Sequence, residues 1–172
     1  MSTHHTVSVE LENKPGALAR VSQMFARRGY NIQSLAVGPT ERPDISRLTL
    51  RVDCSEHSLE QIEKQMHKLV NVLRVRELER GEAVERELAL FTVAATPARR
   101  AELMALADVF EARVADVGPA AMVLEVVGEP EKLDSFEELV RPHGIHEMAR
   151  TGRIGLARAS VRPSRPQQHV LR

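Results

Sequence analysis

The turn formed by residues 13–18 contains residues that could bind a small charged ligand, and it lies just before a predicted helix. It reads Asn13-Lys14-Pro15-Gly16-Ala17-Leu18, follows an alternating segment and precedes a stretch with helical spacing. The start of a helix leaves backbone N–H groups unpaired and carries partial positive charge, so it can bind a carboxylate. Gly16 lets a ligand approach the backbone closely, and the Asn13 amide can both donate and accept hydrogen bonds. This chemistry suits the carboxylate and ammonium groups of a free amino acid.

The same residues also fit a turn that binds nothing. In that interpretation Asn13 caps the following helix, and Pro15 and Gly16 only reverse the chain. Local sequence alone favours this structural interpretation, because most turns of this composition have no ligand. Both interpretations stay open on these residues.

No other group of residues in the sequence predicts a catalytic or metal centre. His143 and His146 could form part of a metal site, but no third ligand follows at a recognisable spacing. Cys54 has no activating partner nearby in sequence, so we expect it to act as a small apolar side chain. The sequence contains no phosphate loop, dinucleotide fingerprint or nucleophile elbow. We therefore expect a chain that is not an enzyme and that holds no metal or cofactor of its own.

Apolar periodicity predicts the elements that must position the turn. Alternation predicts strands at 7–11, 31–37, 48–52 and 72–78, and helical spacing predicts one helix through residues 18–25. A second helix should begin at Ser58, which forms a capping box with Gln61. The order over these residues is βαββαβ, with a loop at 38–43.

The same order is predicted again in the second half of the chain. We expect strands at 88–95, 112–117, 121–127 and 145–149. One helix should be capped by Thr96 with Pro97 in its first position, and another should open at Pro130. The fold class is thus α+β, with two ferredoxin-like βαββαβ domains. We expect one domain at 4–79, a charged linker at 80–86, a second domain at 87–158 and a disordered tail at 159–172.

Composition excludes several classes of protein. The 172 residues contain 24 basic and 24 acidic side chains and only 3% aromatics, which argues against nucleic-acid binding. No apolar run is long enough to cross a bilayer, and no basic and apolar leader precedes the first strand. Cys54 is the only cysteine, which fits a reducing compartment. We expect a cytoplasmic protein without nucleic-acid or membrane partners.

Longer strings of sequence resemble a known family. Residues 12–51 contain Glu-Asn-Lys-Pro-Gly-Ala-Leu-Ala-Arg-Val, then Phe-Ala-Arg-Arg-Gly-Tyr-Asn-Ile-Gln-Ser-Leu-Ala-Val-Gly-Pro-Thr-Glu and Ser-Arg-Leu-Thr. Together with Glu60–Gln65, Lys68–Val72 and Val84–Leu88, they resemble the ACT domain of acetolactate synthase (acetohydroxyacid synthase) small subunits. The resemblance covers nearly all of residues 7–94, and Ile145–Leu156 is similar to the family's closing segment.

The resemblance implies a function and a site. Small subunits of this family are non-catalytic regulatory proteins that activate a separate catalytic large subunit, in which thiamine diphosphate, Mg and FAD are expected. They make it sensitive to valine or another branched-chain amino acid. ACT domains pair as homodimers, with the effector between the glycine turn of one chain and the second strand of the other. On this chain the resemblance assigns effector binding to Asn13, Gly16, Ala17 and Leu18 on one side, and to Asn31 and Ile32 on the other. Asp44 departs from the family pattern, in a loop that we expect to lie away from this site.

Three alternatives remain on sequence alone. The first is a free-standing ACT-type sensor that controls another enzyme or a transcription factor, which co-purification with a large thiamine-dependent partner would exclude. The second is a ferredoxin-like RNA-binding module, but the strands at 7–11 and 47–52 lack the aromatic residues that it requires. The third is a small stand-alone enzyme, for which no catalytic constellation is present.

Overall fold

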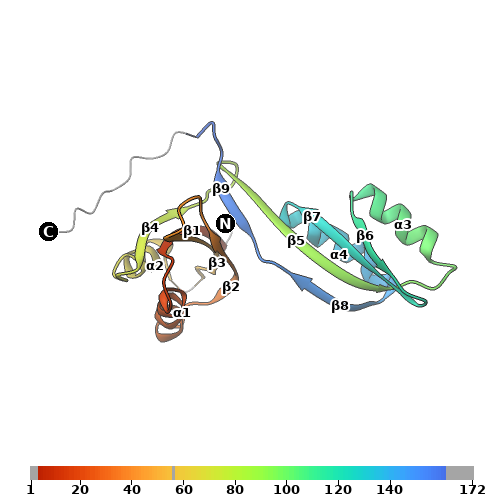
Figure 1. The fold of residues 1–172 in the computed structure, drawn as a ribbon, viewed down its shortest axis with the longest axis horizontal. Coiled ribbons are helices and arrows are strands. Elements are labelled where there is room, and N and C mark those ends of the chain that lie inside the picture. Colours follow the sequence, from red (N-terminus) through yellow and green to blue (C-terminus); the bar gives the residue numbers. More distant parts are fainter. Residues whose placement is uncertain (1–3, 56, 162–172) are drawn as a thin grey trace.

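The computed structural model describes residues 4–55 and 57–161, which form two domains side by side (Figure 1). Each domain has the βαββαβ order of the ferredoxin-like fold, with its helices on one face of an antiparallel sheet. The predicted fold class is therefore confirmed. Of the predicted disordered tail, residues 162–172 lie outside the described residues.

The first domain is a four-stranded sheet covered on one face by two helices. Its strands follow the order β2-β3-β1-β4, so β2 and β4 are the edges. The elements are β1 (His4–Glu12), α1 (Ala17–Arg27), β2 (Ile32–Pro39), β3 (Ile45–Asp53), α2 (Leu59–Met66) and β4 (Val72–Glu77). Because β1 and β2 both run antiparallel to β3, they are parallel to each other, and their carboxyl ends meet at one end of the sheet.

Alternation along the central strands separates a core face from a polar face. Val7, Val9 and Leu11 of β1 are fully or almost fully buried against the helices. The intervening residues point to the opposite face because successive strand residues alternate. The two helices complete this core with Val21, Phe25, Ile62 and Met66. The Ser58 side chain accepts the backbone N–H of Gln61, as the predicted helix start requires.

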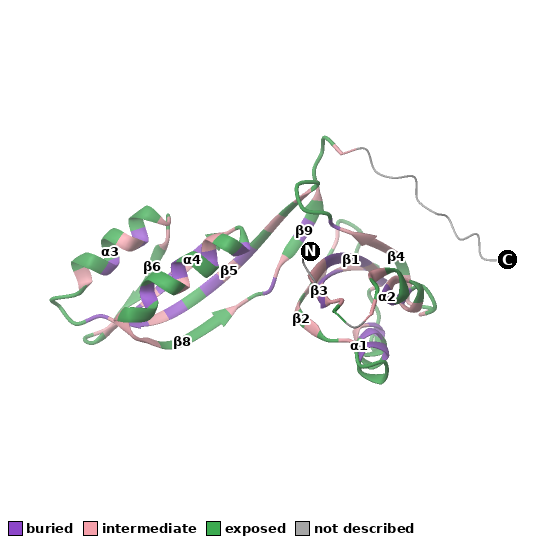
Figure 2. Ribbon diagram, turned by 180° about the vertical axis from the view of Figure 1, so that it is seen from behind, coloured by how far each residue is buried: buried purple, intermediate pink, exposed green. Residues whose placement is uncertain are grey.

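The second domain repeats this arrangement with strand order β6-β7-β5-β8. Its elements are β5 (Ala83–Ala94), α3 (Arg100–Val109), β6 (Arg113–Val117), β7 (Ala121–Gly128), α4 (Pro130–Val140), a 3-10 turn at Arg141–His143, β8 (Ile145–Arg150) and β9 (Ile154–Ala157). Phe136 lies edge-on to both Phe91 and Phe110, with ring centroids 5.4 and 5.3 Å away. Figure 2 shows the buried residues of this core along β5 and α4. Pro130 occupies the start of α4 as predicted.

The start of α3 differs from the prediction. Thr96 does not cap the helix with its side chain; its carbonyl accepts the N–H groups of Arg99 and Arg100, at 2.9 and 3.2 Å. These bonds form a turn at residues 97–99, so α3 begins only at Arg100. The prediction that Pro97 is the first helical residue was wrong, because a turn separates it from the helix.

A two-stranded ribbon joins the domains where a linker was expected. Residues 83–86, predicted as part of the linker 80–86, are instead the first four residues of β5 and pair with β9 in antiparallel register. The run of charges in this segment suggested a loop, but Glu85 is only 20% exposed because it pairs with Arg153 at 3.1 Å. The partner strand lies 68 residues away in the chain.

This ribbon lies against the polar face of the first sheet. Thr6, Ser8 and Thr49 on that face are each no more than 5% exposed. A methyl group on Gly155 of β9 would come within 2.5 Å of Leu78 Cδ1, and one on Gly152 within 3.1 Å of the Leu35 carbonyl oxygen. Glycines therefore allow the second domain to pack closely on the first.

Candidate functional site

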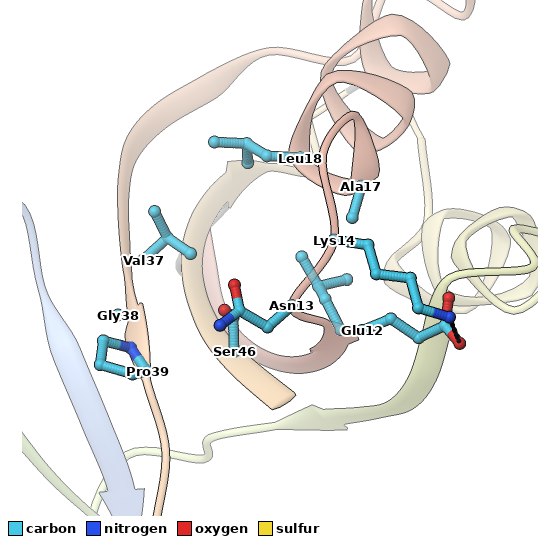
Figure 3. Close-up of a pocket in the computed structure, with 10 residues that line it drawn as sticks. Glu12, Asn13, Lys14, Ala17, Leu18, Val37, Gly38, Pro39 and Ser46 are labelled. Carbon is cyan, nitrogen blue, oxygen red and sulfur yellow. Dashed lines mark hydrogen bonds and ion pairs between the residues drawn. The ribbon is translucent and has the colours of Figure 1, made fainter. Parts of the chain in front are cut away.

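A cavity of about 400 Å³ opens at the end of the first sheet where β1 and β2 finish (Figure 3). It lies between the turn before α1 and the last residues of β2. Its lining consists of Leu11, Glu12, Asn13, Lys14, Ala17, Leu18, Val37, Gly38, Pro39 and Ser46. The site is thus assembled around the turn that the sequence singled out.

The start of α1 leaves donors free beside this cavity. Gly16 is the residue before the helix, has a φ of 83°, and no side chain caps the helix. The N–H groups of Leu18 and Ala19 have no acceptor in the described part of the chain. Free N–H groups and the partial positive charge of a helix start favour an anion here. The left-handed backbone at Gly16 also explains the glycine, because other residues are strained there.

Asn13 connects the turn to the loop between β2 and β3. Its Nδ2 donates to the Pro43 carbonyl at 2.9 Å, and its backbone N–H donates to the Asp44 carbonyl at 2.7 Å. The prediction that Asn13 caps the helix was therefore wrong. The loop containing Asp44 was expected to lie away from the site, and this too was wrong, since it contacts Asn13 directly. Because Nδ2 donates to Pro43, the side-chain oxygen Oδ1 of Asn13 remains available as an acceptor.

Glu12 and Lys14 supply one charge of each sign at the cavity. Lys14 Nζ lies 3.1 Å from Glu12 Oε1, and Asn71 Nδ2 donates to Glu12 Oε2 at 2.6 Å. The hydrogen bonds from Lys14 and Asn71 lower the pKa of Glu12 below its ordinary value. Glu12 therefore stays ionised at neutral pH and offsets the charge of Lys14.

Apolar side chains form two walls of the cavity. Leu18 from α1 and Val37 from β2 extend toward the space between these elements (Figure 3). Val37 is 46% exposed although its pairing with the buried Leu48 places it on the core side of β2. The arrangement offers backbone donors, an amide oxygen and an apolar niche around one small volume.

The structure brings some of the expected site residues together within one chain. Asn13, Ala17 and Leu18 line the cavity, and Gly16 precedes the helix that borders it. Asn31 and Ile32 lie at the opposite end of β2, where Ile32 packs on the core and the Asn31 carbonyl accepts the Asp53 N–H at 3.2 Å. These two residues were expected from a second copy of the chain.

The part of the lining that comes from β2 and β3 was not predicted from the sequence. Val37 was assigned to a strand end and Gly38 and Pro39 to a loop, while Ser46 was noted only within a family string, and none of the four was assigned to the site. The predicted fold contained the signal, because a ferredoxin-like sheet places its first two strands parallel on either side of the third, with their carboxyl ends at the same end of the sheet.

The sequence also drew attention to His143, His146 and Cys54. Among residues 4–55 and 57–161, no three His, Cys, Asp or Glu side chains are placed to hold a metal ion. Burial raises the pKa of the Cys54 thiol, which disfavours the reactive thiolate. No helix in this part of the chain is long and apolar enough to cross a membrane.

Comparison with known proteins identifies the family. Residues 7–74 match a family profile described as the AHAS small subunit-like ACT domain, and residues 86–159 match one described as the small subunit of acetolactate synthase. The chain is 45% identical to a probable acetolactate synthase small subunit of Archaeoglobus fulgidus, over 91% of this chain and 98% of the relative. The chain belongs to the acetolactate synthase small subunit family. It is therefore a regulatory, non-catalytic subunit, as expected.

Further relatives agree over the same length. The acetolactate synthase small subunit of Mycolicibacterium smegmatis is 46% identical, over 90% of this chain and 91% of the relative. The crystal structure of the small subunit from Thermotoga maritima superposes with a TM-score of 0.83 at 37% identity, covering 92% of this chain and 99% of that one. Because the family profiles match both domains, the small subunit is favoured over a free-standing ACT-type sensor.

Proposed function

We propose that this chain activates the catalytic large subunit of acetolactate synthase and makes it sensitive to valine or another branched-chain amino acid. The observation that carries the proposal is the cavity at the uncapped start of α1, beside the free edge of the first sheet. Binding there would link the amino acid to the arrangement of two copies of the chain.

The cavity offers a contact for each part of a branched-chain amino acid. The carboxylate would accept the free N–H groups of Leu18 and Ala19. The ammonium group would donate to Oδ1 of the Asn13 side chain, which the contact with Pro43 leaves unused. A short branched side chain would lie between Leu18 and Val37. Asn13, Gly16, Ala17 and Leu18 would then have the effector-binding role that the family resemblance implies.

A homodimer formed through β2 would complete this site. No strand in the described part of the chain pairs with the outer edge of β2, so its backbone groups are available to another strand. Antiparallel pairing about the middle of β2 would place Ile32 of a second copy opposite Pro39, with Asn31 next to it. Both residues would then border the cavity of the first copy. The effector would contact two chains and so favour one dimer arrangement, which an allosteric effect requires.

The remaining parts of the proposal concern the partner and the location. Thiamine diphosphate, Mg and FAD would belong to the catalytic large subunit, and this chain would act by binding that subunit. A cytoplasmic location, expected from the single cysteine, stays a prediction.

Reconstitution with the catalytic subunit tests the proposal. We expect the isolated chain to convert no pyruvate, to raise the activity of the catalytic subunit when added, and to make that activity sensitive to valine, leucine or isoleucine. A chain that binds the catalytic subunit but leaves its rate unchanged would contradict activation. Full activation with no response to any of the three amino acids would contradict sensing.

A further inference from the structure

A second cavity, of about 260 Å³, lies on the polar face of the first sheet, against the ribbon from the second domain. Its walls come from both domains. They are Ser8, Glu10, Arg47, Arg74, Arg76, Leu78, Leu156 and Ala157. It is distinct from the proposed effector cavity, whose lining shares none of these residues.

Strand register explains why three arginines meet here. Arg47 of β3 and Arg74 of β4 lie opposite Glu10 of β1 from its two sides, and Arg76 lies opposite Ser8. Directly opposed residues of antiparallel strands project from the same face. The three guanidinium groups therefore converge on one surface, with Glu10 as the single acidic residue of the lining.

Glu10 does not neutralise this surface. One of its carboxylate oxygens lies 3.1 Å from Arg47 Nη2, and the other lies 3.3 Å from Arg42 Nη2. Both oxygens are thus engaged from the β3 side of the sheet. Arg74 and Arg76, on the β4 side, have no acidic partner in the described part of the chain and are only partly exposed. The cavity therefore holds an uncompensated positive charge.

A buried hydroxyl adds a further donor. Ser8 is 5% exposed, and its Oγ accepts a hydrogen bond from Arg47 Nη1 at 3.3 Å. The hydroxyl hydrogen has no acceptor among the described residues, although buried donors are ordinarily satisfied. Charges on an edge strand such as β4 also prevent unwanted strand pairing. That role does not require the arginines to converge with Arg47 and Ser8 on a cavity.

We propose that this cavity binds a phosphate group, either as inorganic phosphate or on a small metabolite. Guanidinium groups donate paired hydrogen bonds to phosphate oxygens, and several of them can surround a tetrahedral anion. The volume exceeds that of the anion alone, and Leu156 and Ala157 of β9 provide an apolar wall for a short organic part. Because the lining comes from both domains, a bound phosphate would hold β9 to the first sheet.

Calorimetric titration of the full chain tests this site without the catalytic subunit or an amino-acid effector. The probes are inorganic phosphate and glycerol 3-phosphate, at low ionic strength where charge contacts are least screened. Binding is measured instead of thermal protection, since phosphate stabilises many proteins without binding them. We expect saturable binding of one phosphate per chain. Tighter binding of glycerol 3-phosphate would assign the site to a metabolite, and equal or weaker binding would assign it to the free anion.

The decisive variant is Arg74→Gln combined with Arg76→Gln. Both side chains are partly exposed on an edge strand, so we expect the unliganded variant to melt as the wild type does. Phosphate affinity should fall about tenfold or more, because two charged donors are lost. The matched control is Arg27→Gln with Arg99→Gln, which removes the same charge from exposed positions outside the cavity and should retain binding. Absence of saturable binding to the wild type, or an equal loss in the control, would overturn the proposal.

Discussion

The two domains share one topology but differ at the corresponding helix start. In the first domain the backbone N–H of Asn13, just after β1, donates to the Asp44 carbonyl in the loop between β2 and β3. In the second domain the N–H of Ala95, just after β5, donates in the same way to the Ala120 carbonyl, at 2.8 Å. Around these equivalent bonds the first domain has a cavity. The second has the side chain of Arg100.

Arg100 bridges the place that remains open in the first domain. Its guanidinium group donates to the carbonyls of Gly118 and Pro119, at 2.7 and 2.9 Å, and to that of Ala95 at 3.3 Å. These carbonyls belong to the end of β5 and to the loop between β6 and β7, the counterparts of the Asn13 turn and the loop that contains Asp44. The same topology therefore leaves an open cavity in the first domain and a filled position in the second. We infer that sensing belongs to the first domain and that the second serves a structural or partner-binding role.

Removing a core ring from the second domain gives the largest expected effect. Phe136→Ala should lower the free energy of unfolding of that domain by about 3–5 kcal/mol, because it leaves a cavity beside Phe91 and Phe110. Denaturant titration measures this loss, and Phe136→Leu should show a smaller one. If sensing belongs to the first domain, valine affinity under native conditions should stay within about threefold of the wild type. A parallel loss of affinity would contradict the division of roles.

A charge at the helix start should have the next largest effect. Gly16→Asp should weaken valine binding more than about a hundredfold, because a carboxylate would occupy the position of the ligand's own. Nothing lies within 4 Å of a Cβ built at Gly16, so the change adds charge without a clash. Gly16→Asn is the matched control, since Asn and Asp both tolerate the left-handed backbone. Equal valine affinity in the two variants would mean that the carboxylate of valine does not bind at the start of α1.

Loss of the Asn13 amide should have an intermediate effect. Asn13→Ala removes the acceptor for the ammonium group and the bond to Pro43. We expect valine affinity to fall about tenfold, as for one charge-assisted hydrogen bond of about 1.5 kcal/mol. Activation of the catalytic subunit should persist, since this contact concerns only the effector. If Asn13→Ala left the half-inhibitory concentration of valine unchanged, the ammonium group of valine would not contact Asn13.

The smallest effect is expected at the equivalent position of the second domain. Arg100→Gln should destabilise that domain by about 1 kcal/mol through weaker bonds to the loop carbonyls, and should leave valine affinity unchanged. Thermal unfolding and calorimetry measure the two quantities. Creation of a second valine site by this variant would show that Arg100 alone keeps the second domain from sensing.

Local patterns predicted most of the fold. Alternation placed Val7, Val9 and Leu11 on the core face, and Ser58 and Pro130 marked two helix starts correctly. These features depend on residues close together in the chain. The family strings assign effector binding to the turn at Asn13 and Gly16, where local chemistry alone favoured a turn without a ligand, and this assignment stays a prediction.

The features that the sequence did not reveal depend on distant contacts. Residues 83–86 form a strand only because β9 pairs with them, and the polar face of the first sheet is buried only because this ribbon covers it. Likewise, Val37 and Ser46 line the cavity because of where β2 and β3 lie in the sheet, and their residue types alone do not indicate it. Gly152 and Gly155 allow close packing between the domains, which no local pattern indicates.

Hydrogen exchange with and without valine most directly tests whether only the first domain senses the effector. We predict added protection at Leu18 and Ala19, whose N–H groups have no acceptor among the described residues, and along β2 at residues 32–39. Residues 95–100 and 117–120 of the second domain should exchange at unchanged rates. Protection confined to that second region, with none at the start of α1, would contradict the assignment of sensing to the first domain.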